Sequence, residues 1–219
     1  MLIGVVAEVD PSETRVAATP ETVKKFVGLG ADVAVQLGAG LKSGVTDADY
    51  QAAGARLVEL GEVLSQADII LKVRRPDEGE LAGIKNGAFV VAIMDPYGRQ
   101  DAIEAMARAG IAAFAMELMP RITRAQVMDV LSSQANLAGY RAVIDGAAEY
   151  GRALPMMMTP AGTVPAAKAF IMGVGVAGLQ AIATARRLGA VVTTMSCFLM
   201  CSATRAACFA WYSFDISLA

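Results

Sequence analysis

Short apolar runs alternate with amphipathic segments along most of this chain, and this alternation constrains the fold more than any other feature of the sequence. The runs are LIGVV (2–6), DVAVQ (32–36), ADIILKV (67–73) and AFVVAIM (88–94). Runs of this length that are separated by amphipathic helices are typical of parallel strands whose sheet is covered on both faces. The sequence therefore predicts an α/β fold built from βα units.

Helix start and stop signals lie between these runs. Thr19 precedes a proline, a pair typical of an N-cap followed by proline in the first turn, and Gly28 or Gly30 marks the end of that helix. Thr46 predicts the cap of a short helix, and segment 101–110 predicts another helix. The first ~120 residues are therefore predicted to form one doubly wound parallel-sheet domain.

A long helix and a proline-containing connector follow this domain. In SSQANLAGYRAVIDGAAEYG (132–151), Ser132 or Ser133 is the predicted cap, apolar residues recur at helical spacing, and Gly151 is the predicted stop. PMMMTPAGTVPAAK (155–168) is interpreted as a connector to a strand at 169–172. We accordingly divide the chain into an N-terminal domain (1–132), a linking helix (133–152) and the start of a second domain (153–219).

The second domain opens with a glycine motif. Gly173, Gly175 and Gly178 are spaced G-x-G-x-x-G between an apolar run and an alanine-rich segment that reaches Leu188. In a Rossmann-type βα turn, the first glycine forms the tight turn, the second lets a pyrophosphate approach the backbone, and the third lets helix and strand pack. Amides at the start of the helix would then meet the phosphates. A motif of this kind is weak evidence alone, because small residues also let helices pack closely.

The residue that should complete this site is missing. A second strand is predicted to start at Ala190, and an Asp or Glu should follow it to bind the adenosine ribose. The sequence there reads Met195, Ser196, Cys197 and Phe198. The fold class is therefore a doubly wound domain followed by an incomplete Rossmann-type domain with an atypical tail (193–219).

Composition excludes several functional classes. The 219 residues include 19 Lys and Arg, 21 Asp and Glu and no His, for a net charge of −2. Without a basic run, nucleic-acid binding is not expected. The three cysteines (Cys197, Cys201, Cys208) have poor spacing for zinc without His, and we interpret them as buried or unpaired thiols, so no metal site is predicted. We expect no signal peptide, because the N-terminus has no basic region and meets acidic residues at once. We expect no transmembrane span, because Arg205 and Asp215 interrupt the apolar C-terminal stretch.

A longer motif is more specific than the glycines. Segment 116–165, MELMPRITRAQVMDVLSSQANLAGYRAVIDGAAEYGRALPMMMTPAGTVP, and segment 173–192, GVGVAGLQAIATARRLGAVV, resemble the NAD(H)-binding subunits of proton-translocating NAD(P) transhydrogenases. The opening segment 13–40, ETRVAATPETVKKFVGLGADVAVQLGAG, resembles both this family and the related alanine dehydrogenases. The resemblance stops near Val192, and we interpret the remaining residues as a frameshifted or truncated ending.

The resemblance implies a cofactor, partners and a set of site residues. It implies NAD(H) as cofactor, NADP(H) on a partner subunit, a homodimer, membrane-spanning partner subunits, and a cytoplasmic location on the inner face of the membrane. A loop across the NAD site would orient the nicotinamide and ribose without acid–base chemistry. The implied residues are Arg121, Gln126, Asp129 and Ser132 in this loop, with Gly173, Gly175, Val176, Ala177 and Gly178 at the glycine turn. On spacing alone, an ordinary helix N-terminus with capping polar residues and an exposed arginine is the better interpretation of these loop residues, and only the resemblance favours a binding role.

Two other functions stay open. An amino-acid dehydrogenase of the alanine dehydrogenase type needs a general acid/base, and that family has a His where this chain has Met94, Asp95 and Pro96. Lys72 and Arg15 match substrate-binding positions of alanine dehydrogenases, but we expect them to be inherited scaffold residues that form surface or interdomain ion pairs here. A third interpretation is an inactive fragment that keeps a folded first domain and a dimer surface.

Overall fold

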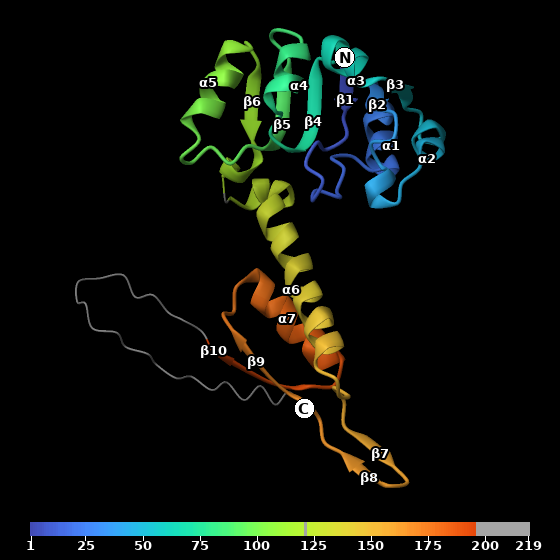
Figure 1. Ribbon diagram of the computed structural model, residues 1–219, viewed down its shortest axis with the longest axis vertical. Helices are drawn as coiled ribbons and strands as arrows, with labels where there is room; N and C mark the ends of the chain where they lie inside the picture. Colours follow the sequence, from blue (N-terminus) through green and yellow to red (C-terminus); the bar gives the residue numbers. More distant parts are fainter. Residues whose placement is uncertain (121, 196–219) are drawn as a thin grey trace, which may run out of the picture. The chain divides into compact units, whose positions relative to one another are not determined.

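The computed structural model describes residues 1–120 and 122–195, and the chain divides into two compact units. Unit 1 comprises Met1–Asp129, and unit 2 begins at Val130. Figure 1 shows a layered α/β arrangement in unit 1, and a helix pair, a short sheet and a hairpin in unit 2. The boundary falls close to the one expected at residue 132.

Unit 1 contains a six-stranded parallel sheet with the order β3-β2-β1-β4-β5-β6. The order reverses next to β1, so that β2 and β4 flank the first strand, which is the arrangement of a doubly wound sheet. The strands are β1 (Leu2–Val5), β2 (Asp32–Gln36), β3 (Arg56–Val58), β4 (Ile69–Arg74), β5 (Phe89–Ile93) and β6 (Ala112–Ala115). The α/β fold class predicted for this part of the chain is confirmed.

Helices cover the two faces of this sheet through two separate cores. One core joins the sheet residues Val5, Val33 and Val35 to Val23 and Tyr50 of two helices, and the other gathers around Ile70, Val90 and the leucines and alanines of the remaining helices. The helices are α1 (Pro20–Gly28), α2 (Asp47–Ala52), α3 (Leu60–Gln66), α4 (Glu78–Gly83) and α5 (Gln100–Arg108), with 3₁₀ turns at Leu41–Ser43, Met116–Leu118 and Thr123–Met128.

The helix caps predicted at Thr19 and Thr46 in unit 1 are confirmed. The Thr19 hydroxyl accepts a hydrogen bond from the Thr22 N–H at the start of α1, and Thr46 forms a reciprocal capping box with Asp49 at the start of α2. The strands β3 and β6 and the helices α3 and α4 are additions to the predicted set. They are short, so their apolar residues do not repeat often enough to reveal a period.

Unit 2 begins with α6 (Val130–Glu149), the longest helix of the described residues. The prediction that Ser132 or Ser133 caps this helix is wrong, because the helix starts at Val130 and includes both serines in its first turn. Gly151 follows the helix with a φ of 67°, the left-handed conformation expected of the residue that ends it.

The rest of unit 2 is a hairpin and a βαβ unit. The connector expected at 155–168 contains an antiparallel hairpin, β7 (Met157–Thr159) paired with β8 (Gly162–Val164). Strand β9 (Lys168–Met172) then leads into α7 (Val176–Arg187), and β10 (Val191–Met195) pairs with β9 in parallel. The helix and both strands of the predicted βαβ unit are confirmed.

Candidate functional site

The turn between β9 and α7 has the backbone geometry of a phosphate-binding turn. Gly173 has a φ of 95°, which an L side chain rarely adopts. Gly175 precedes α7 with extended backbone angles, and no described side chain caps the helix there. A Cβ added at Gly173 or Gly175 would have no neighbouring heavy atom within 4 Å. The first turn of α7 is therefore open to an anion that approaches its amides.

Gly178 serves packing. A Cβ added at Gly178 would overlap the carbonyl oxygen of Gly173, so only glycine lets the turn fold back against the helix. Gly139 does the same between the two helices of unit 2, because a Cβ there would overlap the carbonyl oxygen of Ala177 in α7. Helices α6 and α7 consequently approach each other closely. Because Ala177 belongs to the first turn of α7, this contact holds α6 against the start of the helix that follows the glycine turn.

The loop residues implied by the resemblance are divided between the two units. Gln126 is exposed on the 3₁₀ turn Thr123–Met128, and Asp129 follows this turn at the end of unit 1. Ser132 lies on α6 in unit 2, the unit that also contains the glycine turn with Val176 and Ala177. Arg121 lies outside the described residues, as do Ser196 and the three cysteines.

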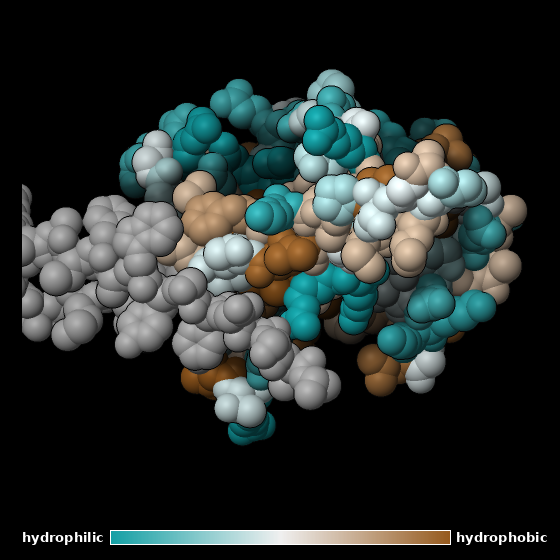
Figure 2. Space-filling model, turned by 90° about the horizontal axis from the view of Figure 1, so that it is seen from below, coloured by the Kyte–Doolittle hydropathy of each residue, from teal (hydrophilic) through white to brown (hydrophobic). Residues whose placement is uncertain are grey.

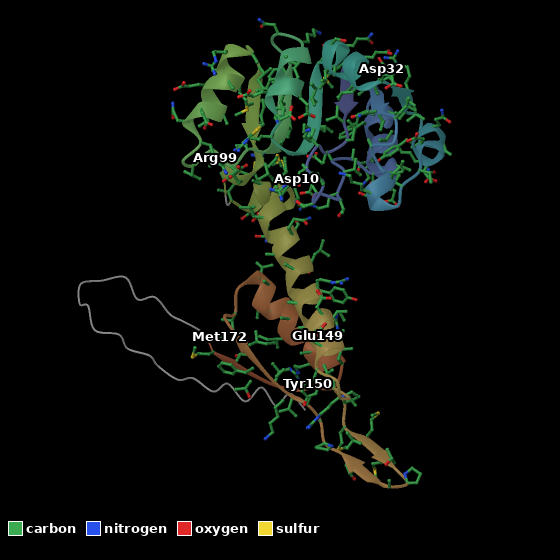
Figure 3. All side chains as sticks on the ribbon, in the orientation of Figure 1. Asp10, Asp32, Arg99, Glu149, Tyr150 and Met172 are labelled. Carbon is green, nitrogen blue, oxygen red and sulfur yellow. The ribbon has the colours of Figure 1, made fainter. Side chains whose placement is uncertain are left out.

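Unit 1 contains a pocket that the sequence did not predict. The pocket has a volume of about 350 Å³ and lies where β1, β4 and β5 end. Figure 3 shows Asp10 and Arg99 at this edge of the sheet and Asp32 at the opposite edge. Both acidic and basic side chains line it: Glu8, Asp10, Lys72, Arg74, Arg75, Asp77, Glu80, Asp95 and Arg99.

The buried charges of this pocket are paired within the protein. Lys72 on β4 is buried and forms an ion pair with Glu80 on α4. The buried Glu8 carboxylate accepts hydrogen bonds from the backbone N–H groups of Val73, at 2.6 Å, and Arg74, at 3.2 Å. The only sign of this cluster in the sequence was Lys72, a lysine within an apolar run. A lysine in a buried strand needs a buried partner for its ammonium group, so this residue indicates an acidic side chain nearby.

A second charge cluster fixes the loop after β1. Arg15 pairs with the buried Glu13 at 2.7 Å, and Arg74 approaches the same carboxylate at 3.1 Å. The hydrogen bond from Arg15 is the main cause that lowers the pKa of Glu13 to about 2. Arg15 and Lys72 therefore both form ion pairs, but the expectation of a surface or interdomain pair is wrong for Lys72, whose pair with Glu80 is buried within unit 1.

The end of β5 has an unusual backbone conformation. Asp95 has a φ of 46°, which is uncommon for a residue other than glycine. The N–H groups of Met94 and Asp95 both donate to the carboxylate of Glu117, and Arg75 donates to the carbonyl oxygens of the same two residues. These bonds hold the turn in place at the position where alanine dehydrogenases carry a histidine.

The described residues, 1–120 and 122–195, lack two kinds of feature. No group of His, Cys, Asp and Glu side chains in these ranges is arranged to hold a metal ion. None of the helices in the same ranges combines the length and apolar character needed to cross a bilayer.

The doubly wound sheet, followed by a βαβ unit with an open glycine turn, defines a protein of the dinucleotide-binding α/β class. Residues 4–138 match the alanine dehydrogenase/PNT N-terminal domain, and residues 142–200 match the alanine dehydrogenase/PNT C-terminal domain. The chain belongs to the alanine dehydrogenase/PNT family.

Within this family, the chain is a homologue of the NAD(P) transhydrogenase alpha subunit. It is 56% identical over 198 residues to an alpha-subunit protein of the NAD(P) transhydrogenase from Rhodospirillum rubrum, a match that covers 88% of this chain and 52% of the relative. A crystal structure of transhydrogenase from Sinorhizobium meliloti is 63% identical with a TM-score of 0.88, covering 91% of this chain and 60% of that one. The chain thus spans about half the length of the curated relatives it matches.

Alanine dehydrogenases are more distant relatives. The enzyme from Mycobacterium tuberculosis is 31% identical over 201 residues, covering 89% of this chain and 53% of the relative. A solved L-alanine dehydrogenase is 28% identical with a TM-score of 0.79, covering 90% of this chain and 55% of that one. The fold is shared, and the sequence lies closer to the transhydrogenases. Membership of the family implies NAD(H) binding.

Proposed function

We propose that this chain supplies the NAD(H)-binding part of an NAD(P) transhydrogenase, which transfers hydride between NADH and NADP⁺. The observation that carries this proposal is the difference in identity, 56–63% to transhydrogenases against 28–31% to alanine dehydrogenases. Since the chain spans about half of these relatives, the activity of the whole subunit is proposed for the complete assembly rather than for this chain alone.

The residues of the glycine turn fit a dinucleotide. Gly173 and Gly175 leave the turn free of side chains, and no described side chain caps the start of α7, so backbone amides are available for a pyrophosphate. Gly178, Val176 and Ala177 form the first turn of the helix that these amides belong to. No charged residue is needed for this contact, because the helix N-terminus itself carries partial positive charge.

We assign the orientation of the nicotinamide and its ribose to Arg121, Gln126, Asp129 and Ser132. An amide can bond a carboxamide, a guanidinium supplies a charged fork, and a carboxylate or hydroxyl can bond ribose hydroxyl groups. When bound, the nicotinamide ring supplies the hydride chemistry. The four residues hold the ring and exclude water, a task that needs no acid or base at the reacting carbon and is compatible with a chain without histidine.

The proposal includes partners. NADP(H) would bind a second subunit, and membrane-spanning subunits would couple hydride transfer to proton translocation. We place this chain on the inner face of the membrane, attached through those subunits, and we infer a homodimer.

The alternative is an amino-acid dehydrogenase. The pocket in unit 1 favours it, because the pocket is lined by Lys72, which matches a substrate-binding position of that class. The internal ion pairs of Arg15 with Glu13 and of Lys72 with Glu80 argue against it, since both cations already have carboxylate partners. The absence of any histidine removes the general acid/base of that class.

A reconstitution experiment tests the choice. A chimera that joins this chain to the part of the Sinorhizobium relative that it does not match, mixed with an NADP(H)-binding partner, should pass hydride from NADH to an NADP⁺ analogue. The same mixture should not oxidise NADH when pyruvate and ammonia are added. Amination of pyruvate without hydride transfer to the analogue would reverse the assignment.

A further inference from the structure

The carboxylate of Glu117 ties the chain that leaves β6 to the end of the neighbouring strand β5. Glu117 is half-buried and lies on the 3₁₀ turn Met116–Leu118, directly after β6. Its two oxygens accept hydrogen bonds from the N–H groups of Met94, at 3.1 Å, and of Asp95. A charged acceptor forms shorter and stronger bonds than a neutral one, so this side chain fastens the two segments to each other.

The turn that Glu117 binds is itself fixed from a second side. Asp95 has a φ of 46° and precedes Pro96, which restricts the backbone of the residue before it. The guanidinium of Arg75 donates to the carbonyl oxygens of Met94, at 2.9 Å, and Asp95, at 3.1 Å. A backbone conformation of this kind persists only where its surroundings hold it. Glu117 holds the N–H groups of this turn and Arg75 holds its carbonyl groups.

Segment 122–129, which begins five residues after Glu117, buries little of its own surface. Ala125 is its only buried residue, whereas Ile122 is 57% exposed and Val127 is 91% exposed. Apolar residues also reach the surface elsewhere in the molecule, as the brown areas of Figure 2 show. The backbone bonds of the segment are local, such as the one from the Ala125 N–H to the carbonyl oxygen of Ile122 at 2.9 Å. Such bonds shape the segment but do not attach it to the sheet.

We propose that Glu117 is a positioning residue for hydride transfer, because it attaches segment 122–129 to the turn at the end of β5. The inference rests on the proposed function, in which Gln126 and Asp129 of this segment orient the nicotinamide and its ribose. Glu117 touches no substrate and acts through these two side chains. Since a displacement of ~1 Å at the reacting groups can slow a reaction by about a hundredfold, a loosened segment slows hydride transfer more than it weakens cofactor binding.

Glu117→Gln in the chimera with the Sinorhizobium relative tests the proposal. Glutamine keeps the size of the side chain but has one acceptor oxygen, and its NH₂ group would face a backbone N–H. With the NADP(H)-binding partner, we expect kcat for hydride transfer to fall about tenfold or more. The Kd for NADH should change by less than about threefold, because the glycine turn is untouched. Glu104→Gln, at an exposed residue of α5, is the matched control and should leave both values unchanged.

Arg75→Met tests whether Glu117 acts through the turn at Met94 and Asp95. This change removes both bonds to the carbonyl groups and keeps the apolar stem of the side chain. It should lower kcat by itself, and the double variant with Glu117→Gln should be slower than Glu117→Gln alone by no more than about twofold, since both residues hold the same turn. Losses of the two single variants that multiply in the double variant would overturn this route.

Hydrogen exchange of the 219-residue chain supplies a readout that does not depend on activity. In Glu117→Gln, the amides of segment 122–129 should exchange faster, while those of β1 and β4 should keep their rates because the sheet stays folded. An unchanged exchange rate in segment 122–129, or a kcat equal to that of the unsubstituted chimera, would overturn the proposal. An unsubstituted chimera that transfers no hydride would contradict the proposed function, and faster exchange in Glu117→Gln would still support the attachment of the segment by Glu117.

Discussion

Gly175 and Gly178 stand three positions apart, yet they differ in what surrounds them. The space around an added Cβ is empty at Gly175 and occupied by the Gly173 carbonyl oxygen at Gly178. Gly175 also has a φ of −75°, which any residue can adopt. The first glycine is thus free for a ligand and the second is required for folding, so substitutions at the two positions separate binding from stability.

Gly175→Val should remove nucleotide binding while unit 2 stays folded. The branched side chain would occupy the space through which a pyrophosphate reaches the backbone, and its Cβ would meet no heavy atom within 4 Å. We expect the NADH affinity of a chimera that joins this chain to the unmatched part of the Sinorhizobium relative to fall at least a hundredfold in a calorimetric titration. Unchanged hydrogen exchange in α7 is the control, and unchanged affinity would contradict the assignment of this turn.

Gly178→Ala should destabilise unit 2. The added methyl group must displace the backbone of the turn, and overpacking of this kind costs about 1–3 kcal/mol. Faster hydrogen exchange in α7 and β9 would report the loss. The matched control is Gly146→Ala in α6, where the Cβ meets nothing within 4 Å, so the helix should gain about 0.5–1 kcal/mol.

Glu13 should make the stability of unit 1 depend on pH in the acid range. Its pKa is about 2 in the folded state against 4.5 for the free group. A lowered pKa means that the ionised side chain stabilises the fold above about pH 4.5 and that this contribution is lost as the pH falls toward 2. Glu13→Gln should therefore cost about 1–2 kcal/mol at pH 7, discounted because both arginines are partly exposed.

Chemical denaturation of the chain at several pH values checks this. The difference between the wild type and Glu13→Gln should shrink as the pH drops through this range. Glu62→Gln is the control, because Glu62 forms an exposed pair with Arg56 at 3.4 Å and such pairs contribute about 0–1 kcal/mol. A constant difference down to pH 2 would show that the ion pairs do not cause the effect.

At the scale of elements, the buried pair of Lys72 and Glu80 fastens β4 to α4. Glu80 also accepts a hydrogen bond from the Asp77 N–H in the capping box that starts α4. Glu80 therefore contributes both to the ion pair and to the helix cap, whereas Lys72 contributes to the ion pair. Removal of one partner leaves a buried charge, which costs about 3–5 kcal/mol. We expect Glu80→Leu to be more destabilising than Lys72→Met in urea unfolding.

The double variant Lys72→Met with Glu80→Leu supplies the control for this pair. Once both charges are gone, only the Glu80 half of the capping box of α4 is lost, because Asp77 still accepts from the backbone N–H of position 80, so the double variant should be more stable than Glu80→Leu alone. A double variant whose loss equals the sum of the two single losses would mean that the charges do not interact in the folded protein.

Elements with strong local signals could be predicted, and elements defined by distant contacts could not. The runs around Val5, Val35, Ile70 and Val90 predicted their strands, because a buried parallel strand is apolar on both faces. The pocket could not be predicted, since it depends on a hydrogen bond between Glu8, just after β1, and Val73 on the neighbouring strand β4, 65 residues further along the chain. The start of α6 was misplaced because serines are common caps, and the two here lie inside the helix.

At the scale of the whole chain, unit 1 should fold without unit 2. Its sheet, both of its cores and its ion-pair clusters lie within residues 1–129. A fragment of residues 1–129 should keep the circular dichroism and the slow-exchanging amides that these residues show in the full chain. A fragment with rapid exchange throughout its central strands would show that unit 1 depends on unit 2 for stability.

The position of β1 has a consequence for synthesis of the protein. This strand comes first in unit 1, yet it lies in the middle of the sheet between β2 and β4. A ribosome that adds ~5–20 residues per second releases β1 several seconds before β4, at Ile69–Arg74, is made. During that interval one edge of this apolar strand is unpaired, so a chaperone that binds nascent chains has its best target in the first residues of unit 1.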